Sequence, residues 1–460
     1  MIRDKFRLLS PSTKIAVSFL VIIFIGSLLL SMPISHLPDS NVSYFENLFT
    51  SVSMVCVTGL LTTPIVTTYS LFGKIVCILL MQVGGLGLMT ILAAFIVGVG
   101  RRMTFRDTIA VNEALNRHKI GDFKDYLTSI IKYTAIIEGS AFVLLALRFV
   151  PDFGMKKGLF HALFLAVSGF SNAGFDSFEG DSLQNYVHDP LVNGVMMGLI
   201  ILGGIGFSVW FDVTENVHSI FKKRVKIGFM KDYKRLQVHT RLALNISLFL
   251  LILGTVVFLA LEWSNPESIG TFNVGDKILA ALFQSTTFRT AGFTTIDFLD
   301  FNHLTLFFLI ITSFIGGSPG GTAGGLKTTT VALVVLLMYN EVKGQRYVNY
   351  AYHTTPTETV RRALVVVITF FVCFMLGTSL LLYFEQDQQP FHLMFEIASA
   401  LTTIGLTIDL TPELSAASQV VIMVLMFIGR IGPITIFLSL GRSHKKQRNH
   451  KYAKTNILIG

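Results

Sequence analysis

Charged residues are scarce in this chain of 460 residues, and cysteine is nearly absent. Charged side chains make up 14% of the residues, against about 25% in soluble proteins, while hydrophobic residues make up 52%. So few charges cannot cover the surface of a soluble protein of this length, which excludes a soluble fold. The three cysteines, Cys56, Cys77 and Cys373, stand far apart in apolar stretches, so no disulfide framework or zinc site follows from them.

Catalytic patterns are lacking as well. The 11 histidines are scattered along the chain, and no Ser-His-Asp, Cys-His or metal-ligand arrangement stands out. We therefore expect that the chain is not an enzyme and holds no cofactor of its own.

What the chain does have is long apolar runs and an uneven distribution of charge. Several runs are long enough to cross a bilayer as helices, which takes about 20 residues. Of the 37 Lys and Arg residues, 29 lie in five polar stretches: 1–14, 101–132, 222–241, 341–362 and 442–454. The intervening polar stretches hold 16 of the 28 acids. The positive-inside rule places the basic stretches in the cytoplasm, together with both termini. A multi-pass protein of the cell membrane is predicted, and the basic patch at 222–226 is interpreted as a membrane anchor rather than a nucleic-acid site.

Two glycine motifs recur four times. The segments CVTGL, SNAGF, RTAGF and TTIGL, called here the glycine segments, place their glycines 115, 118 and 113 residues apart, at Gly59, Gly174, Gly292 and Gly405. A second motif begins 25, 29, 24 and 24 residues later, at Gly84, Gly203, Gly316 and Gly429. Two motifs that keep step through four copies indicate a fourfold internal repeat.

Each repeat predicts a helix, a re-entrant loop and a second helix. Full helices run outward at 13–32, 128–149, 240–261 and 360–383, and full helices return at 72–99, 191–215, 304–338 and 416–440. Between them, a helix too short to span the membrane ends in the glycine segment. Backbone at that depth is tolerated where it lines a pore, and glycine permits the positive φ that turns carbonyls inward. The helix dipoles favour a cation there.

The predicted fold is therefore an all-α membrane protein with eight transmembrane helices around one pseudo-fourfold pore. Its parts are repeat 1 (1–100), repeat 2 (101–221), repeat 3 (222–345), repeat 4 (346–442) and a cytoplasmic tail (443–460). The candidate ion-binding residues are the glycine of each glycine segment and the two residues before it: Val57, Thr58, Gly59, Asn172, Ala173, Gly174, Thr290, Ala291, Gly292, Thr403, Ile404 and Gly405.

The third returning helix is interrupted by GGSPGGTAGGLKTTT. Six glycines and a proline cannot remain regular helix, because each glycine costs about 1 kcal/mol and proline about 3. Two interpretations stay open on the residues alone: a flexible gate below the pore loops, or a kink that lets helices cross closely. A phosphate-binding loop does not fit, since Leu326 separates Gly325 from Lys327. The candidate gate residues are Gly316, Gly317, Ser318, Pro319, Gly320, Gly321, Gly324, Gly325, Lys327 and Arg430.

Several ionisable residues lie at membrane depth. Arg430 interrupts the last returning helix where a charge costs at least about 2.5 kcal/mol, so we expect it to bond carbonyls of the glycine-rich stretch. Arg289 is expected to support its glycine segment from the side away from the pore, because a positively charged side chain that lined a cation site would repel the ion. Glu46 and Glu396 are expected to bond loop amides, and Glu138 is expected to be a packed core residue.

With these motifs the chain resembles the Ktr/Trk/HKT superfamily of potassium transporters, and more closely its KtrB-type membrane subunits. The resemblance implies potassium uptake through a filter of four single-glycine loops, with the glycine-rich stretch as its gate. It also implies a homodimer and a cytosolic ATP/ADP-binding ring of the KtrA/KtrC kind. Potassium would be the transported ion and sodium a candidate activator. Because Gly59 is retained where some relatives carry serine, a potassium-selective member is favoured.

The alternative is a secondary active cation symporter with a midplane site. That class usually shows inverted or two-part repeats, whereas the four repeats here share one orientation. The basic stretches 101–124 and 222–241 and the tail 442–460 are the predicted docking surfaces for a regulator, and the apolar end of the tail is expected to pack at a dimer interface. No nucleic-acid partner is expected.

Overall fold

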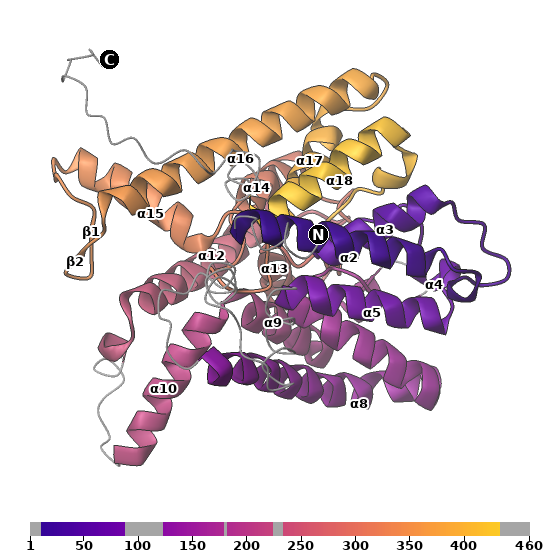
Figure 1. The fold of residues 1–460 in the computed structure, drawn as a ribbon, viewed down its shortest axis with the longest axis horizontal. Coiled ribbons are helices and arrows are strands. Elements are labelled where there is room, and N and C mark those ends of the chain that lie inside the picture. Colours follow the sequence, from indigo (N-terminus) through magenta and orange to yellow (C-terminus); the bar gives the residue numbers. More distant parts are fainter. Residues whose placement is uncertain (1–10, 88–122, 179–181, 224–232, 433–460) are drawn as a thin grey trace, which may run out of the picture.

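The computed structural model describes residues 11–87, 123–178, 182–223 and 233–432 (Figure 1). The described residues are all-α apart from one short antiparallel hairpin, in which Asn349 pairs with Thr354 and Tyr350 with His353. The helices are α2 (Pro11–Leu30), α3 (Tyr44–Cys56), α4 (Ile65–Thr68), α5 (Leu71–Leu86), α8 (Phe123–Ser171), α9 (Pro190–Gly204), α10 (Phe207–Lys223), α12 (Val238–Glu262), α13 (Val274–Thr287), α14 (His303–Ser313), α15 (Thr328–Val342), α16 (Thr357–Phe384), α17 (Pro390–Thr402) and α18 (Ala416–Ile431). Short 3-10 turns lie at Pro33–Ser35, Gln184–Tyr186 and Thr411–Glu413, and the strands are β1 (Asn349–Tyr350) and β2 (His353–Thr354).

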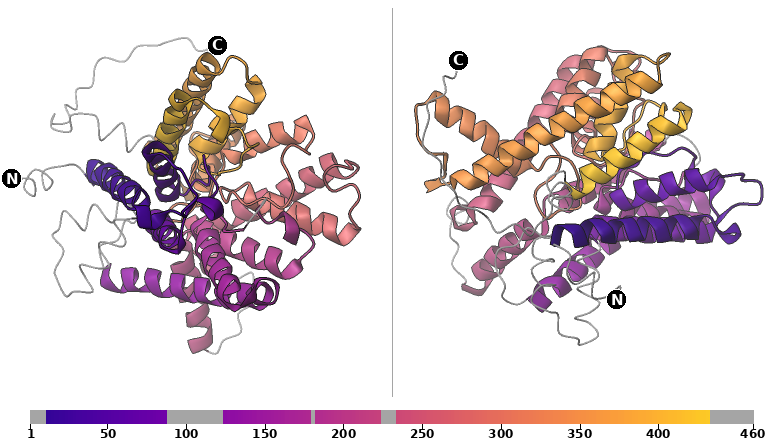
Figure 2. Two further views of the ribbon diagram at one scale, coloured as in Figure 1. Left: turned by 90° about the vertical axis from the view of Figure 1, so that its right-hand side faces the viewer. Right: turned by 45° about the horizontal axis from the view of Figure 1, so that its top comes forward.

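The helices form four groups around a common centre, in chain order (Figure 2, left). Among the described residues, four helices are long and apolar enough to cross a membrane: Thr13–Leu30, Leu127–Ser171, Val238–Glu262 and Thr357–Phe384. They contain or closely match the four predicted outgoing helices, one in each repeat. The outgoing helices are therefore confirmed.

A short helix follows each outgoing helix and ends at its glycine segment. In repeats 1, 3 and 4 these are α3, α13 and α17; in repeat 2 the short helix is the second part of α8, beyond a break at Gly154 with φ 78°. Ser43 begins α3 with a capping box, in which Glu46 accepts from the Ser43 backbone at 2.7 Å. Glu46 therefore caps the start of its own helix, and the expectation that it bonds the loop amides is wrong.

The returning helices differ from the prediction. The span predicted at 191–215 is two helices, α9 and α10, with a 99° bend between them. The span predicted at 304–338 is divided into α14 and α15 by the glycine-rich residues, and this interruption was predicted from their composition. In repeats 1 and 4, α5 and α18 end at Gly87 and Gly432. Gly87, Gly206 and Gly432 hold equivalent places in their repeats and all have positive φ, which an α-helix cannot continue.

The returning helices pack closely on the last turn of the short helices. A Cβ at Gly84, Gly203 or Gly429 would overlap the carbonyl oxygen of Val55, Phe170 or Leu401 respectively. Each of those carbonyls belongs to the residue just before the last residue of the short helix. Glycine at these positions therefore allows backbone to meet backbone, which explains physically why the two motifs keep step along the chain.

The loop after α12 is held by one buried carboxylate. Glu262 has no exposed surface and accepts hydrogen bonds from the Asn302 amide at 3.0 Å, the Ser268 hydroxyl at 2.7 Å, Asn265 at 2.6 Å and the Thr305 hydroxyl. It thereby joins the end of α12 to the start of α14.

Glu262→Ala is expected to destabilise the protein by at least about 2 kcal/mol, because buried donors would be left without an acceptor. The measurement is the melting temperature of the detergent-purified protein. Glu358→Ala is the control, since Glu358 makes an exposed ion pair with Arg362 that is worth at most about 1 kcal/mol. Equal melting temperatures for the two variants would contradict the prediction.

Parts of several sequence predictions lie outside the described residues: the ends of the returning helices predicted at 72–99 and 416–440, most of the basic stretch 101–124, the middle of 222–241, and the tail 442–460 with its apolar end.

Candidate functional site

The glycines of the four glycine segments meet at the centre of the fold. A Cβ on Gly59 would lie 3.1 Å from the Ala173 carbonyl oxygen, and a Cβ on Gly174 would lie 3.0 Å from that of Ala291. In the same sense, a Cβ on Gly292 would overlap the Ile404 oxygen, and one on Gly405 would overlap the Thr58 oxygen. Each glycine therefore faces the carbonyl before the glycine of the next repeat. The four form a closed ring, called here the central ring.

Each glycine segment alternates its backbone conformation. The glycines of the central ring have φ of 73° to 106°, as the motif predicted. The residues two places earlier also have positive φ: Val57, Asn172, Thr290 and Thr403. Sequence reasoning gave no signal for these four, since three of them are β-branched and rarely adopt this region. Such a conformation persists where the surrounding structure imposes it, and it clusters at functional sites.

The ends of the short helices impose that conformation. In repeat 1 the Val57 amide donates to Met54 O at 3.2 Å and the Thr58 amide to Ser53 O at 2.9 Å. The same pair of bonds recurs in repeat 2 at Asn172 and Ala173, and in repeat 4 at Thr403 and Ile404. The pattern closes the helix with a left-handed residue and turns the chain toward the centre.

Several polar side-chain atoms of the glycine segments are buried without a hydrogen-bond partner among the described residues: Thr58 Oγ1, Asn172 Nδ2, Thr290 Oγ1 and Thr403 Oγ1. An unpaired buried polar group is unfavourable unless a ligand or water completes it. These atoms come from all four repeats and belong to the residues predicted from the sequence. The structure therefore brings the twelve predicted ion-binding residues together around one axis.

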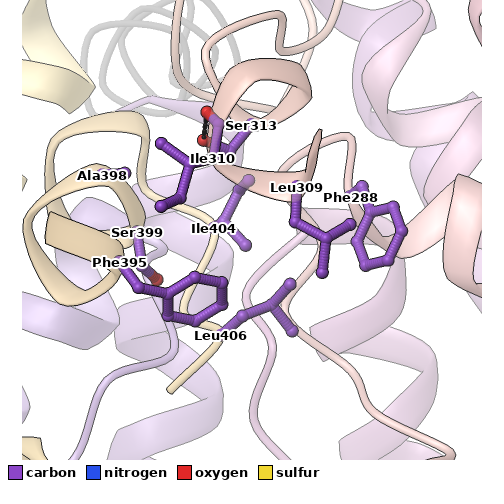
Figure 3. Close-up of a pocket in the computed structure, with 9 residues that line it drawn as sticks. All are labelled: Phe288, Leu309, Ile310, Ser313, Phe395, Ala398, Ser399, Ile404 and Leu406. Carbon is purple, nitrogen blue, oxygen red and sulfur yellow. Dashed lines mark hydrogen bonds between the residues drawn. The ribbon is translucent and has the colours of Figure 1, made fainter. Parts of the chain in front are cut away.

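The back of the repeat 4 segment is apolar. Ile404 sends its carbonyl toward Gly292 in the central ring, and its side chain points into a small pocket between repeats 3 and 4 (Figure 3). The pocket is lined by Phe288, Leu309, Ile310, Ser313, Phe395, Ala398, Ser399, Ile404 and Leu406. Hydrophobic packing thus anchors the segment from behind and leaves its backbone for the centre.

The glycine-rich residues 316–325, called here the Gly-rich loop, lie against the same axis. The loop bonds repeat 2, where the Ser318 amide donates to Gly204 O at 2.8 Å and the Phe207 amide to Gly320 O at 3.1 Å. It also lies against the glycine segments of two repeats, since a Cβ on Gly316 would lie 3.2 Å from Thr290 Cγ2 and one on Gly324 would overlap Thr403 Oγ1. Thr322 of the loop also lies 3.0 Å from Asn172 of the repeat 2 segment, so the loop contacts three glycine segments.

Arg430 connects the Gly-rich loop to repeat 1. Its guanidinium donates to the carbonyls of Thr322, Gly84 and Gly85, the last at 3.0 Å. The predicted contact between Arg430 and loop carbonyls is confirmed. Its partners in repeat 1 could not be predicted, because they lie about 345 positions away in the sequence. Thr322, absent from the candidate gate residues, is the loop residue that Arg430 holds.

The other ionisable residues serve mainly as supports. Lys327 donates to Ala323 O at 2.6 Å and so closes the Gly-rich loop on itself. Arg289 donates to Ser247 of α12 at 3.0 Å, which agrees with bracing from behind. Glu396 accepts from the Ile408 amide at 3.3 Å and from two threonine hydroxyls, as expected. Glu138, which has no evident partner in the sequence, accepts from Gln82 at 3.0 Å.

Acidic groups of two loops of repeat 3 act on one another: Asp297 and Asp300 precede α14, and Glu267 follows α12. Burial, and then repulsion from Asp297 and Glu267, raise the pKa of the Asp300 carboxyl. Repulsion among carboxylates marks a region of negative potential, which raises the local concentration of cations.

Comparisons with known proteins show the family and the fold of the chain. A family model described as TrkH, a cation transport protein, matches residues 3–452. The chain is 36% identical to the Ktr system potassium uptake protein B of Bacillus subtilis, over 98% of this chain and 97% of that one. It is 33% identical to the potassium/sodium uptake protein NtpJ of Enterococcus hirae, over 98% of each. The crystal structure of the potassium transporter TrkH from Vibrio parahaemolyticus has the same fold, with a TM-score of 0.72 at 19% identity, over 95% of this chain and 86% of that one.

Proposed function

Because this chain belongs to the TrkH family of cation transport proteins, we propose that it takes up potassium ions across the plasma membrane. The ions pass through a selectivity filter formed by the four glycine segments. The observation that carries this proposal is the central ring, in which four positive-φ glycines each face a carbonyl of the next repeat. Backbone carbonyls in a ring replace the hydration shell of a potassium ion.

The Gly-rich loop is the gate in this proposal. It lies against three glycine segments, and Arg430 ties it to repeat 1. Displacing the loop would break its bond to Arg430 and remove its backbone from the ion path. A loop rich in glycine adopts alternative backbone conformations at small steric cost, so it suits a moving part.

The proposal also covers the topology of the chain and its assembly with other subunits. In this proposal the chain is built from the four repeats predicted from the sequence, and both termini lie in the cytoplasm. The membrane part is a homodimer controlled by a cytosolic ATP/ADP-binding ring of the KtrA/KtrC kind, and sodium acts as an activator. A relative whose name places it in a Ktr system supports a multi-subunit complex.

The test is cation uptake by liposomes that contain the purified protein. We expect potassium uptake to exceed sodium uptake, and the variant lacking residues 316–325 to take up potassium several times faster than the wild type. Protein-free liposomes give the background rate of ion leakage, and liposomes treated with an ionophore give the maximum ion uptake.

Two outcomes would contradict the proposal. Uptake that occurs only under a sodium or proton gradient, with no passive flux of either ion, would contradict the gated pore and favour a coupled symporter. Equal uptake of potassium and sodium by the wild type would contradict the filter, whatever the deletion does.

A further inference from the structure

Thr322 of the Gly-rich loop is hydrogen-bonded through its amide, its carbonyl and its hydroxyl. Its amide donates to Gly203 O at 3.1 Å, and its carbonyl accepts from Arg430. Its hydroxyl oxygen lies 2.9 Å from Phe170 O and 3.0 Å from Asn172 Oδ1. The side chain has no exposed surface. One residue therefore joins the loop to three other parts of the fold.

The partner of interest is Asn172, which belongs to the glycine segment of repeat 2. Its side chain is 1% exposed, and its φ is 55°. A hydroxyl has one proton, so Thr322 cannot donate to Phe170 and Asn172 at the same time. With the Asn172 amide rotated by half a turn, Nδ2 would donate to Thr322 while Thr322 donates to Phe170 O. Either orientation allows one hydrogen bond between the Asn172 amide and Thr322, and the rotated one also satisfies Phe170 O.

A glycine makes room for this contact. A Cβ on Gly203 would lie 2.7 Å from the Thr322 hydroxyl and 2.8 Å from Asn172 Oδ1, which is closer than packing allows. Glycine at position 203 therefore leaves the space that Asn172 and Thr322 need to approach each other.

The corresponding residues of the other repeats make no such bond. Val57 is apolar, and Thr290 and Thr403 meet the loop at the glycines Gly316 and Gly324. Within the described residues, neither threonine hydroxyl has a hydrogen-bond partner. Among the four glycine segments, repeat 2 is therefore the one whose left-handed residue is hydrogen-bonded by its side chain to the loop.

We propose that Asn172 is a positioning residue that couples the filter to the gate, with Thr322 of the Gly-rich loop fixing the backbone of the repeat 2 glycine segment. This inference rests on the proposed function. When the Gly-rich loop is in its bound position, Thr322 holds the side chain of Asn172. Because Ala173 follows Asn172, this also holds the Ala173 carbonyl in its position next to Gly59. By linkage, whatever moves the loop changes the filter, and an ion that orders the filter favours the bonded loop.

The test compares the ratio of potassium to sodium uptake in liposomes for matched variants. Thr322→Val removes the hydroxyl at nearly constant volume and is expected to lower the ratio about fivefold or more while raising total uptake. Thr322→Ser keeps the hydroxyl and is expected to restore the wild-type ratio. Asn172→Ala is expected to lower the ratio to a similar degree, and the double variant should lower it no further. The variant lacking residues 316–325 also lacks Thr322, so its ratio should fall as well.

Two controls separate coupling from general loosening. Thr328→Val removes a hydroxyl that bonds Ser318 within the loop region at 2.9 Å, so it should increase uptake without changing the ratio. Thr312→Val removes a bond within α14 and should change neither. An unchanged ratio in Thr322→Val, or an equal fall in Thr328→Val, would overturn the coupling and leave the pore and gate intact. A wild-type protein without potassium preference would instead overturn the proposed function, and this inference with it.

Discussion

Arg430→Ala is expected to raise passive potassium uptake about tenfold. Arg430 donates to the Thr322 carbonyl of the Gly-rich loop and to the carbonyls of Gly84 and Gly85 in repeat 1. A hydrogen bond from a charged group contributes about 1.5–3 kcal/mol, and about 1.4 kcal/mol shifts an equilibrium tenfold. Loss of the bond to Thr322 therefore favours the displaced loop over the bound one. Removing a positive charge near the ion path acts in the same direction. The measurement is the initial rate of potassium uptake by liposomes.

Two variants make this result specific to Arg430. Arg430→Lys keeps the positive charge but lacks the branched guanidinium that bonds the loop and repeat 1 together. Its rate of potassium uptake is therefore expected to lie between the rates of the wild type and Arg430→Ala. Arg362→Ala removes an exposed arginine whose ion pair with Glu358 lies on α16, and it should leave uptake unchanged. Wild-type uptake in a correctly folded Arg430→Ala protein would show that Arg430 does not hold the gate.

Gly405→Ser is expected to lower the ratio of potassium to sodium uptake about tenfold or more. Gly405 has φ of 82°, and its Cβ would overlap the Thr58 carbonyl and lie 2.6 Å from Gly59 Cα. A residue other than glycine at such a φ costs about 1–2 kcal/mol before any overlap. The serine must therefore displace the backbone of repeat 1, and it opens the central ring at one of its four junctions. Competitive uptake of the two ions measures the ratio.

The matched control is another glycine of the same protein. Gly198 lies within α9, and nothing stands within 4 Å of the place where its Cβ would be. Gly198→Ser should therefore keep the wild-type ratio. An unchanged ratio in Gly405→Ser, beside active wild-type protein, would refute the filter role of the central ring.

Much of the architecture could be predicted because it depends on local features. Charge asymmetry and apolar length predicted the four outgoing helices that the structure shows. The spacing of Gly59, Gly174, Gly292 and Gly405 predicted the places where positive φ is needed, because glycine is the residue that adopts it most readily.

Other features lay beyond the sequence. The left-handed conformations of Val57 and Thr403 contradict their local preference, and the hydrogen bonds that end α3 and α17 impose them. The bend between α9 and α10 was missed because an apolar run has the same pattern whether its helix is straight or broken. Gly206, where the chain bends, is one of several glycines in that run.

The sequence by itself determined the membrane setting, the fourfold repeat and the positions at which the backbone must leave the helix. These follow from solvation and backbone sterics, which act on each segment separately. The tertiary structure alone decided which carbonyl each glycine faces, which loop residue Arg430 bonds, and that Thr322 meets Asn172. Those contacts join residues at least 108 positions apart. No local preference specifies them, because they form only when all four repeats close around one axis.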